Sequence, residues 1–137
     1  MCDQLKRALP IVCSMLLAGA ASPALWAKEC TAKSGERRVG LIELYTSEGC
    51  NSCPPADTWI NELSRHGLST DRVVPLALHV DYWDYIGWKD SFAKPAFNER
   101  QKKYVGNLKA RYAYTPQIVV DGKAHVVGSH RDEVESL

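Results

Sequence analysis

Residues 39–55 read VGLIELYTSEGCNSCPP, an apolar run followed by two cysteines and two prolines. The run is rich in aliphatic, β-branched and aromatic side chains, which predicts a buried β-strand over residues 39–45. Turn-forming residues follow up to Pro55, and apolar side chains then fall at 56, 59, 60 and 63, the spacing of one helix face. The sequence therefore predicts a strand, a Cys-x-x-Cys turn and an amphipathic helix in immediate succession.

The rest of the chain continues this alternation of strands and helices. A second buried strand is predicted over residues 73–80 and a helix over about 95–112. Residues 116–122 and 124–127 are predicted to form a hairpin with Asp121-Gly122 as its turn. This order predicts an α/β sandwich with a mixed sheet, a C-terminal β-hairpin and flanking helices. A last helix begins near residue 129 and is cut off at residue 137, so we expect the C-terminus to be incomplete.

The N-terminal segment has the layout of a secretory signal peptide. A basic start at Lys6-Arg7 precedes an apolar stretch over residues 8–21 and small residues over 22–27. Cleavage is expected after Ala27 or after Ala24. We therefore predict a signal peptide and a periplasmic or secreted location for the mature protein.

Residues 28–137 then form one domain of ordinary globular composition. The whole chain of 137 residues has 17 Lys and Arg against 16 Asp and Glu, and removing residues 1–27 leaves equal numbers of each sign. This balance gives no reason to expect nucleic-acid binding, which usually leaves a basic footprint. No apolar run reaches the roughly 20 residues that span a bilayer, so no membrane contact is expected after signal removal.

The cysteines carry the chemistry. Cys50 lies after a strand and before a helix, where free amides and the helix dipole favour the thiolate, the attacking species in disulfide exchange. Cys53, one turn later, can resolve the mixed disulfide. Two alternatives stay open, a metal-binding cysteine pair and an inert staple, although so short a loop gains little by the loop-entropy argument. Cys30 is a third cysteine without an evident partner.

Pro116 opens the predicted third strand within the sequence Tyr114-Thr-Pro. A proline is sterically acceptable at the start of a strand, and a cis peptide bond is possible there. Combined with Cys-x-x-Cys, the pattern is that of thioredoxin-like proteins, in which a cis-proline faces the cysteine pair.

Four segments together resemble one bacterial family: ELYTSEGCNSCPPAD (43–57), HVDYWD (79–84), GWKD (87–90) and YTPQIVVDG (114–122). This family of secreted, thioredoxin-like proteins is filed as domain of unknown function 1223. The resemblance covers about residues 37–131 and implies a thioredoxin-like fold and an exported location. It implies no substrate, because the family has no assigned function. Its members usually continue well beyond the point where this chain stops.

Ordinary thioredoxins carry a buried acid six residues before the first cysteine, where this chain has Leu44. Glu43, one residue earlier, points to the opposite face of a regular strand. It is therefore either a proton shuttle that needs a bulge to reach the cysteines, or an acid paired elsewhere.

The segment 81–90 follows the second strand, and ligands gather at the carboxyl ends of strands in such sheets. Its side chains Asp81, Trp83, Asp84 and Trp88 are therefore second-tier site candidates on the same rim as Cys50. The tryptophans are suited to binding a peptide or protein, and the acids to raising the Cys50 pKa. The alternative is that both tryptophans only pack the loop against the domain.

Three functions follow from these residues. The first is a thiol–disulfide oxidoreductase using Cys50, Cys53 and Pro116, with a thiol- or disulfide-bearing peptide or protein as substrate and no cofactor beyond its own disulfide. The second is a copper- or zinc-binding module using Cys50, Cys53 and His79, although residues 28–137 contain no methionine. The third is a non-catalytic interaction domain whose disulfide is structural.

Overall fold

The computed structural model describes residue 33 and residues 35–137. The predicted signal peptide and Cys30 lie outside these residues. Within them, no helix has the length and apolar character needed to cross a membrane.

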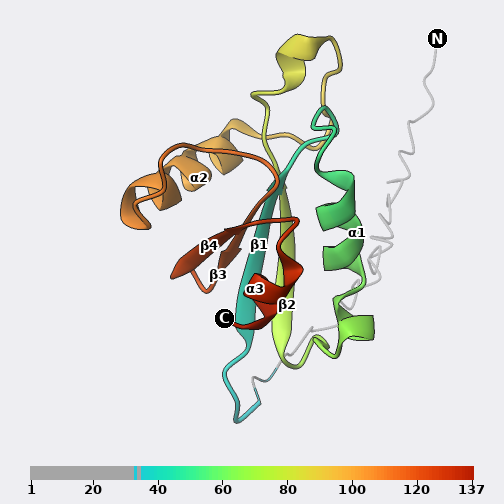
Figure 1. Cartoon of the computed structure of the whole chain (residues 1–137), viewed down its shortest axis with the longest axis vertical. Coiled ribbons are helices and arrows are strands. Elements are labelled where there is room, and N and C mark those ends of the chain that lie inside the picture. Colours follow the sequence, from blue (N-terminus) through green and yellow to red (C-terminus); the bar gives the residue numbers. More distant parts are fainter. Residues whose placement is uncertain (1–32, 34) are drawn as a thin grey trace, which may run out of the picture. The chain divides into compact units, whose positions relative to one another are not determined.

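The sheet has four strands in the order β2-β1-β3-β4 (Figure 1). The central strand β1 (Gly40–Thr46) runs parallel to β2 (Val73–His79) and antiparallel to β3 (Gln117–Val120). Strand β4 (Ala124–Val127) completes the hairpin with β3. The sheet is therefore mixed and carries its antiparallel hairpin at one edge, as the sequence predicts.

Three α-helices flank this sheet: α1 (Pro54–Asn61), α2 (Pro95–Asn107) and α3 (Arg131–Glu135). Two short 3-10 turns, η1 (Leu63–His66) and η2 (Asp84–Ile86), complete the connections. The helices α1 and α2 lie on opposite sides of the sheet (Figure 1). The expected mixed α/β architecture is thereby confirmed.

Alternation along β1 sends its side chains to two separate cores. Ile42 and Leu44 pack with Trp59 of α1 and Val134 of α3 on one face. Tyr45 belongs to the other core, whose neighbours on α2 and after it are Phe97, Tyr104 and Leu108. Consecutive residues of β1 therefore lie on opposite faces of the sheet, so a side chain of β1 can contact either α1 or α2 but not both.

The structure corrects the predicted end of one helix. Helix α1 begins at Pro54, and its two prolines occupy the first helical positions, where prolines are acceptable. Helix α2 ends at Asn107 rather than at residue 112, and Lys109 takes a positive φ of 54° just beyond it. The hairpin turn agrees with its sequence signal, because Asp121 and Gly122 have φ values of 52° and 67°.

Candidate functional site

Cys50 and Cys53 form a disulfide at the start of α1, with their Cα atoms 5.4 Å apart. Cys53 is the residue that caps the helix, and its carbonyl accepts the backbone N–H groups of Ala56 and Asp57. Both cysteines are buried, with exposed fractions of 2% for Cys50 and 0% for Cys53. Cys50 keeps the larger exposed fraction of the two.

Fewer groups are available to stabilise a Cys50 thiolate than the sequence suggests. Pro54 and Pro55 occupy the first two helical positions and have no N–H to offer. The next two amides of the helix donate to the Cys53 carbonyl. The Ser52 hydroxyl lies 3.5 Å from the Cys50 sulfur, so a thiolate there relies on this hydroxyl and on the helix dipole.

Pro116 follows a cis peptide bond and lies beside the first turn of α1. The link between them is Gly128, whose N–H donates to the Pro116 carbonyl at 3.0 Å. A Cβ on Gly128 would lie 2.9 Å from the Cβ atoms of both Ala56 and Pro116. The absence of a side chain at Gly128 therefore lets the start of β3 approach the helix that carries the cysteines.

Trp83 connects the cysteine loop to the proline loop. Its indole N–H donates to the Thr115 hydroxyl at 2.8 Å. Its Cβ lies 3.1 Å from the position of a Cβ on Gly49, the residue before Cys50, and Ile86 Cδ1 lies 3.2 Å from the same position. The structure thus brings Trp83 to the rim of the cysteine pair, where it also fulfils the packing role that the sequence left as its alternative.

Asp90 is a buried acid that organises the rim. It accepts hydrogen bonds from the backbone N–H groups of Glu48 and Phe92, both at 2.9 Å, and its Oδ2 lies 2.7 Å from His79 Nδ1. Burial by itself raises the pKa of Asp90, but these bonds outweigh it and hold that pKa below its usual value. Asp90 therefore joins the loop before Cys50 to the end of β2.

The other rim candidates make structural contacts. Trp88 is 61% exposed and donates its indole N–H to the Glu48 carboxylate at 2.9 Å. Asp84 accepts the backbone N–H of Asp90 at 3.1 Å. Asp81 exchanges hydrogen bonds with Asn98 of α2.

Glu43 is completely buried and lies on the α2 face of the sheet. Its carboxylate accepts a hydrogen bond from Arg100 Nε at 2.5 Å and another from the Tyr104 hydroxyl at 2.6 Å. The bond to Glu43 raises the pKa of Arg100, and burial together with Glu43 raises the pKa of Tyr104. These contacts favour the interpretation of Glu43 as a paired acid.

Asp57 is a site residue that the sequence analysis did not single out. It lies in the first turn of α1, four residues after Cys53, and is half-buried. Burial raises the pKa of Asp57, while Thr46 and His79 lower it and Asp90 raises it by smaller amounts. The signal available in the sequence was its i, i+4 spacing from Cys53, which places both side chains on one helix face.

A metal centre at the cysteines is not supported. Among the residues described, no three His, Cys, Asp or Glu side chains are grouped closely enough to hold a metal ion. His79 instead has its Nδ1 against Asp90.

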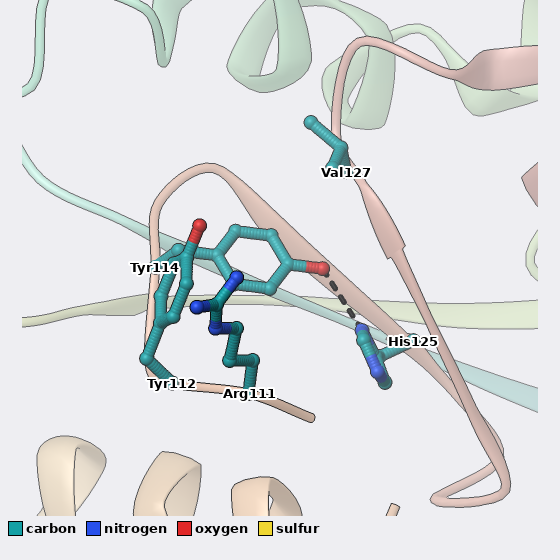
Figure 2. A pocket seen from close by; sticks show the side chains of 5 residues that line it. All are labelled: Arg111, Tyr112, Tyr114, His125 and Val127. Atoms are coloured by element: carbon teal, nitrogen blue, oxygen red, sulfur yellow. Dashed lines mark hydrogen bonds between the residues drawn. The ribbon is translucent and has the colours of Figure 1, made fainter. Parts of the chain in front are cut away.

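A separate hollow of about 330 Å³ lies beyond the proline loop, between the segment before β3 and strand β4 (Figure 2). Its lining is aromatic and cationic, and Tyr114 and His125 are joined there by a hydrogen bond of 2.9 Å. Residues lining the hollow are Arg111, Tyr112, Tyr114, His125 and Val127. Tyr114 lies two residues before Pro116, so the hollow adjoins the cis-proline loop along the chain.

Fold and site together define a mixed α/β domain with a Cys-x-x-Cys disulfide at the N-terminus of a helix. The chain belongs to the family described as protein of unknown function DUF1223, whose model matches residues 41–137. The resemblance noted from the sequence motifs is thereby confirmed.

A crystal structure of a protein from Agrobacterium tumefaciens has a similar fold, with a TM-score of 0.65 and 41% sequence identity. The alignment covers 74% of this chain and 45% of the Agrobacterium chain, so this chain spans less than half of that protein. No curated protein matches this chain.

Proposed function

We propose that this protein is an exported, thioredoxin-like thiol–disulfide exchange protein that acts through Cys50 and Cys53. The observation that carries the proposal is the Cys50–Cys53 disulfide at the start of α1, with Pro116 packed beside that helix. The N-terminal signal layout supports the exported location, where disulfide chemistry is sustained.

The proposed cycle begins with the reduced protein. The Cys50 thiolate attacks one sulfur of a substrate disulfide, which breaks the substrate S–S bond, forms a mixed disulfide and releases one substrate thiolate. Cys53 then loses its proton and attacks the Cys50 sulfur, which re-forms the Cys50–Cys53 disulfide and releases the second substrate thiolate. The substrate gains two electrons, the protein dithiol loses them, and the released thiolates take up protons. The reverse sequence oxidises a substrate dithiol.

Burial supports the proposed roles of the two cysteines. Cys53 is fully buried and held by the helix, whereas Cys50 lies in the preceding turn and retains a small exposed fraction. Because Cys50 is only 2% exposed, a substrate must displace neighbouring groups to reach its sulfur. Trp83 and Ile86 lie against Gly49, the residue before Cys50, and we expect these two side chains to move when a substrate binds.

A redox titration in glutathione buffers tests the proposal, with metal chelated. A potential between roughly −270 and −120 mV is expected, the span of known exchange proteins. A potential below about −300 mV would mark a structural disulfide and overturn the proposal.

Matched cysteine variants test the assignment of roles. With the cysteines outside the pair replaced by serine, the Cys53→Ser variant is expected to accumulate a mixed disulfide with a cysteine-containing peptide disulfide, because Cys50 attacks and no thiol is left to resolve the product. The Cys50→Ser variant is expected to accumulate far less, and mass spectrometry measures both. Equal accumulation in the two variants, or a larger amount in Cys50→Ser, would contradict the assignment.

A further inference from the structure

The resolving step needs a base, because Cys53 is completely buried and must lose its proton before it attacks. Burial in apolar surroundings favours the neutral thiol. Asp57 lies one helical turn after Cys53, and its backbone N–H donates to the Cys53 carbonyl at 3.1 Å. Side chains at i and i+4 of a helix are neighbours on its surface. The spacing therefore puts the Asp57 carboxylate one helical turn from Cys53, on the helix face that carries the thiol to be deprotonated.

The surroundings of Asp57 come from three elements. Thr46 and His79 are register partners at the ends of β1 and β2, and Thr46 is fully buried. Among the described residues, the Thr46 hydroxyl has no hydrogen-bond partner of ordinary geometry, yet it lies close enough to lower the Asp57 pKa. The titratable groups that face Asp57 across this space are His79 and Asp90, and these two are bonded to each other.

The carboxylates of the other acids considered, Glu43, Asp90 and Glu48, already accept hydrogen bonds. Glu43 is bonded to Arg100 and Tyr104 on the far face of the sheet. Asp90 accepts two backbone N–H groups and contacts His79, and Glu48 accepts the indole N–H of Trp88. Asp57 forms no ion pair within residues 35–137. Its carboxylate is thus left available for a proton, and because burial raises its pKa, it is a stronger base than an exposed aspartate.

We propose that Asp57 is the proton acceptor for Cys53 in the resolving step, an inference that rests on the proposed exchange function. The Asp57 carboxylate takes the proton from the Cys53 thiol as Cys53 attacks the Cys50 sulfur of the mixed disulfide. The S–S bond to the substrate breaks, and the substrate leaves as a thiolate. Asp57 then passes the proton to solvent beside His79, whose side chain is 22% exposed. In the reverse direction the protonated Asp57 returns the proton to Cys53.

Stopped-flow reaction with 5,5′-dithiobis(2-nitrobenzoate) tests this step, using the reduced full chain with Cys2, Cys13 and Cys30 replaced by serine, so that only Cys50 and Cys53 can react. Attack by Cys50 releases one equivalent of coloured thiolate, and resolution by Cys53 releases a second. We expect Asp57→Asn to slow the second phase at least tenfold at pH 7 and to leave the first phase nearly unchanged. In this variant the second-phase rate should rise about tenfold per pH unit, since only the thiolate fraction reacts. When Asp57 is present, the second-phase rate should vary much less with pH. The second-phase rates with and without Asp57 should become equal at alkaline pH.

Two variants sharpen the result. Asp57→Glu keeps a carboxylate and is expected to recover part of the second-phase rate. Glu62→Gln removes a carboxylate from the other end of the same helix and is expected to change neither phase. If Asp57→Asn does not fold, as judged by circular dichroism, Asp57→Ser takes its place.

The possible results distinguish a failure of the Asp57 role from a failure of the proposed exchange function. An unchanged second phase in Asp57→Asn at every pH, or an equal slowing of both phases, would overturn the role of Asp57 and leave the exchange function standing. Release of only one equivalent by the chain that keeps Cys50, Cys53 and Asp57 would overturn both, because Cys53 would then not resolve the mixed disulfide.

Discussion

Glu43, on the α2 face of the sheet, is completely buried and accepts hydrogen bonds from Arg100 and Tyr104. Asp57, on the α1 face, is only half-buried and forms no ion pair within residues 35–137. Both acids lie close to the central strand, but their surroundings differ. An acid whose lone pairs are occupied by an arginine and a tyrosine stabilises the fold and has little freedom to exchange a proton. An acid without a cation, held where burial raises its pKa, is suited to proton transfer.

The largest expected effect comes from breaking the Glu43 cluster. Arg100→Ala leaves the Glu43 carboxylate buried with only the Tyr104 hydroxyl, and we expect a loss of about 3 kcal/mol in the free energy of unfolding. Urea denaturation measures this loss. Lys102→Ala, which removes a surface pair with Glu99 on the same helix, should cost less than about 1 kcal/mol. Similar losses for the two variants would show that Glu43 does not depend on Arg100.

Asp90 extends the comparison to a third acid, one that is buried and satisfied by backbone amides. We expect Asp90→Asn to cost about 2 kcal/mol near neutral pH, because a charged acceptor of two backbone N–H groups is lost. Since the pKa of Asp90 is lower in the folded chain, its stabilisation is present above about pH 4 and is lost as the pH falls through the folded pKa.

Urea denaturation at a series of pH values checks this expectation. Wild type should lose stability on acidification, and Asp90→Asn should lose less. Asp84→Asn keeps an oxygen that can accept the Asp90 N–H, and it should stay within about 0.5 kcal/mol of wild type. A wild-type stability that does not change below pH 4 would contradict the assigned role of Asp90.

Packing gives a second way to contrast the two faces. Gly128→Ala places a Cβ 2.9 Å from those of Ala56 and Pro116, so we expect a loss of about 1–2 kcal/mol and a slower reaction at Cys50. Gly106→Ala in α2 meets nothing within 4 Å and should stabilise the protein by about 0.5 kcal/mol. Thermal denaturation and thiol kinetics of the two variants measure the difference. If Gly128→Ala changed neither the stability nor the reaction rate at Cys50, the close packing of Pro116 against α1 would not be required for either.

Local patterns in the sequence predicted the architecture well. The alternation in β1, the turn at Asp121-Gly122 and the helix after the cysteines all depend on neighbouring residues, and the structure has each of them. The end of α2 is wrongly predicted at residue 112, because the side chains of residues 108–112 are compatible with a helix and only the folded chain gives Lys109 its positive φ.

Partnerships between distant residues were not predictable in this way. Nothing near Glu43 in the sequence indicates that Arg100 will bond it, and nothing near His79 indicates Asp90 as its partner. The sequence left Glu43 between a proton shuttle and a paired acid, and only the packing of α2 against the sheet distinguishes them. Asp57 was quoted within a motif, but its burial depends on Thr46 and β2, which reach α1 only in the folded chain.

The smallest effect is expected at Asp57, and its sign is opposite to that of the other two acids. Burial raises the pKa of Asp57 above the unfolded value, so ionising it opposes folding at neutral pH, and this cost is absent below about pH 4. Asp57→Asn is therefore expected to be slightly more stable than wild type at pH 7, by less than about 1 kcal/mol, and equal to it near pH 3.5. Urea denaturation at the two pH values measures both differences. A variant that gains stability while its resolving step slows would show that this acid is retained at a cost to the fold. A variant that loses stability at pH 7 would instead place Asp57 with Glu43 and Asp90 among the acids that stabilise the domain.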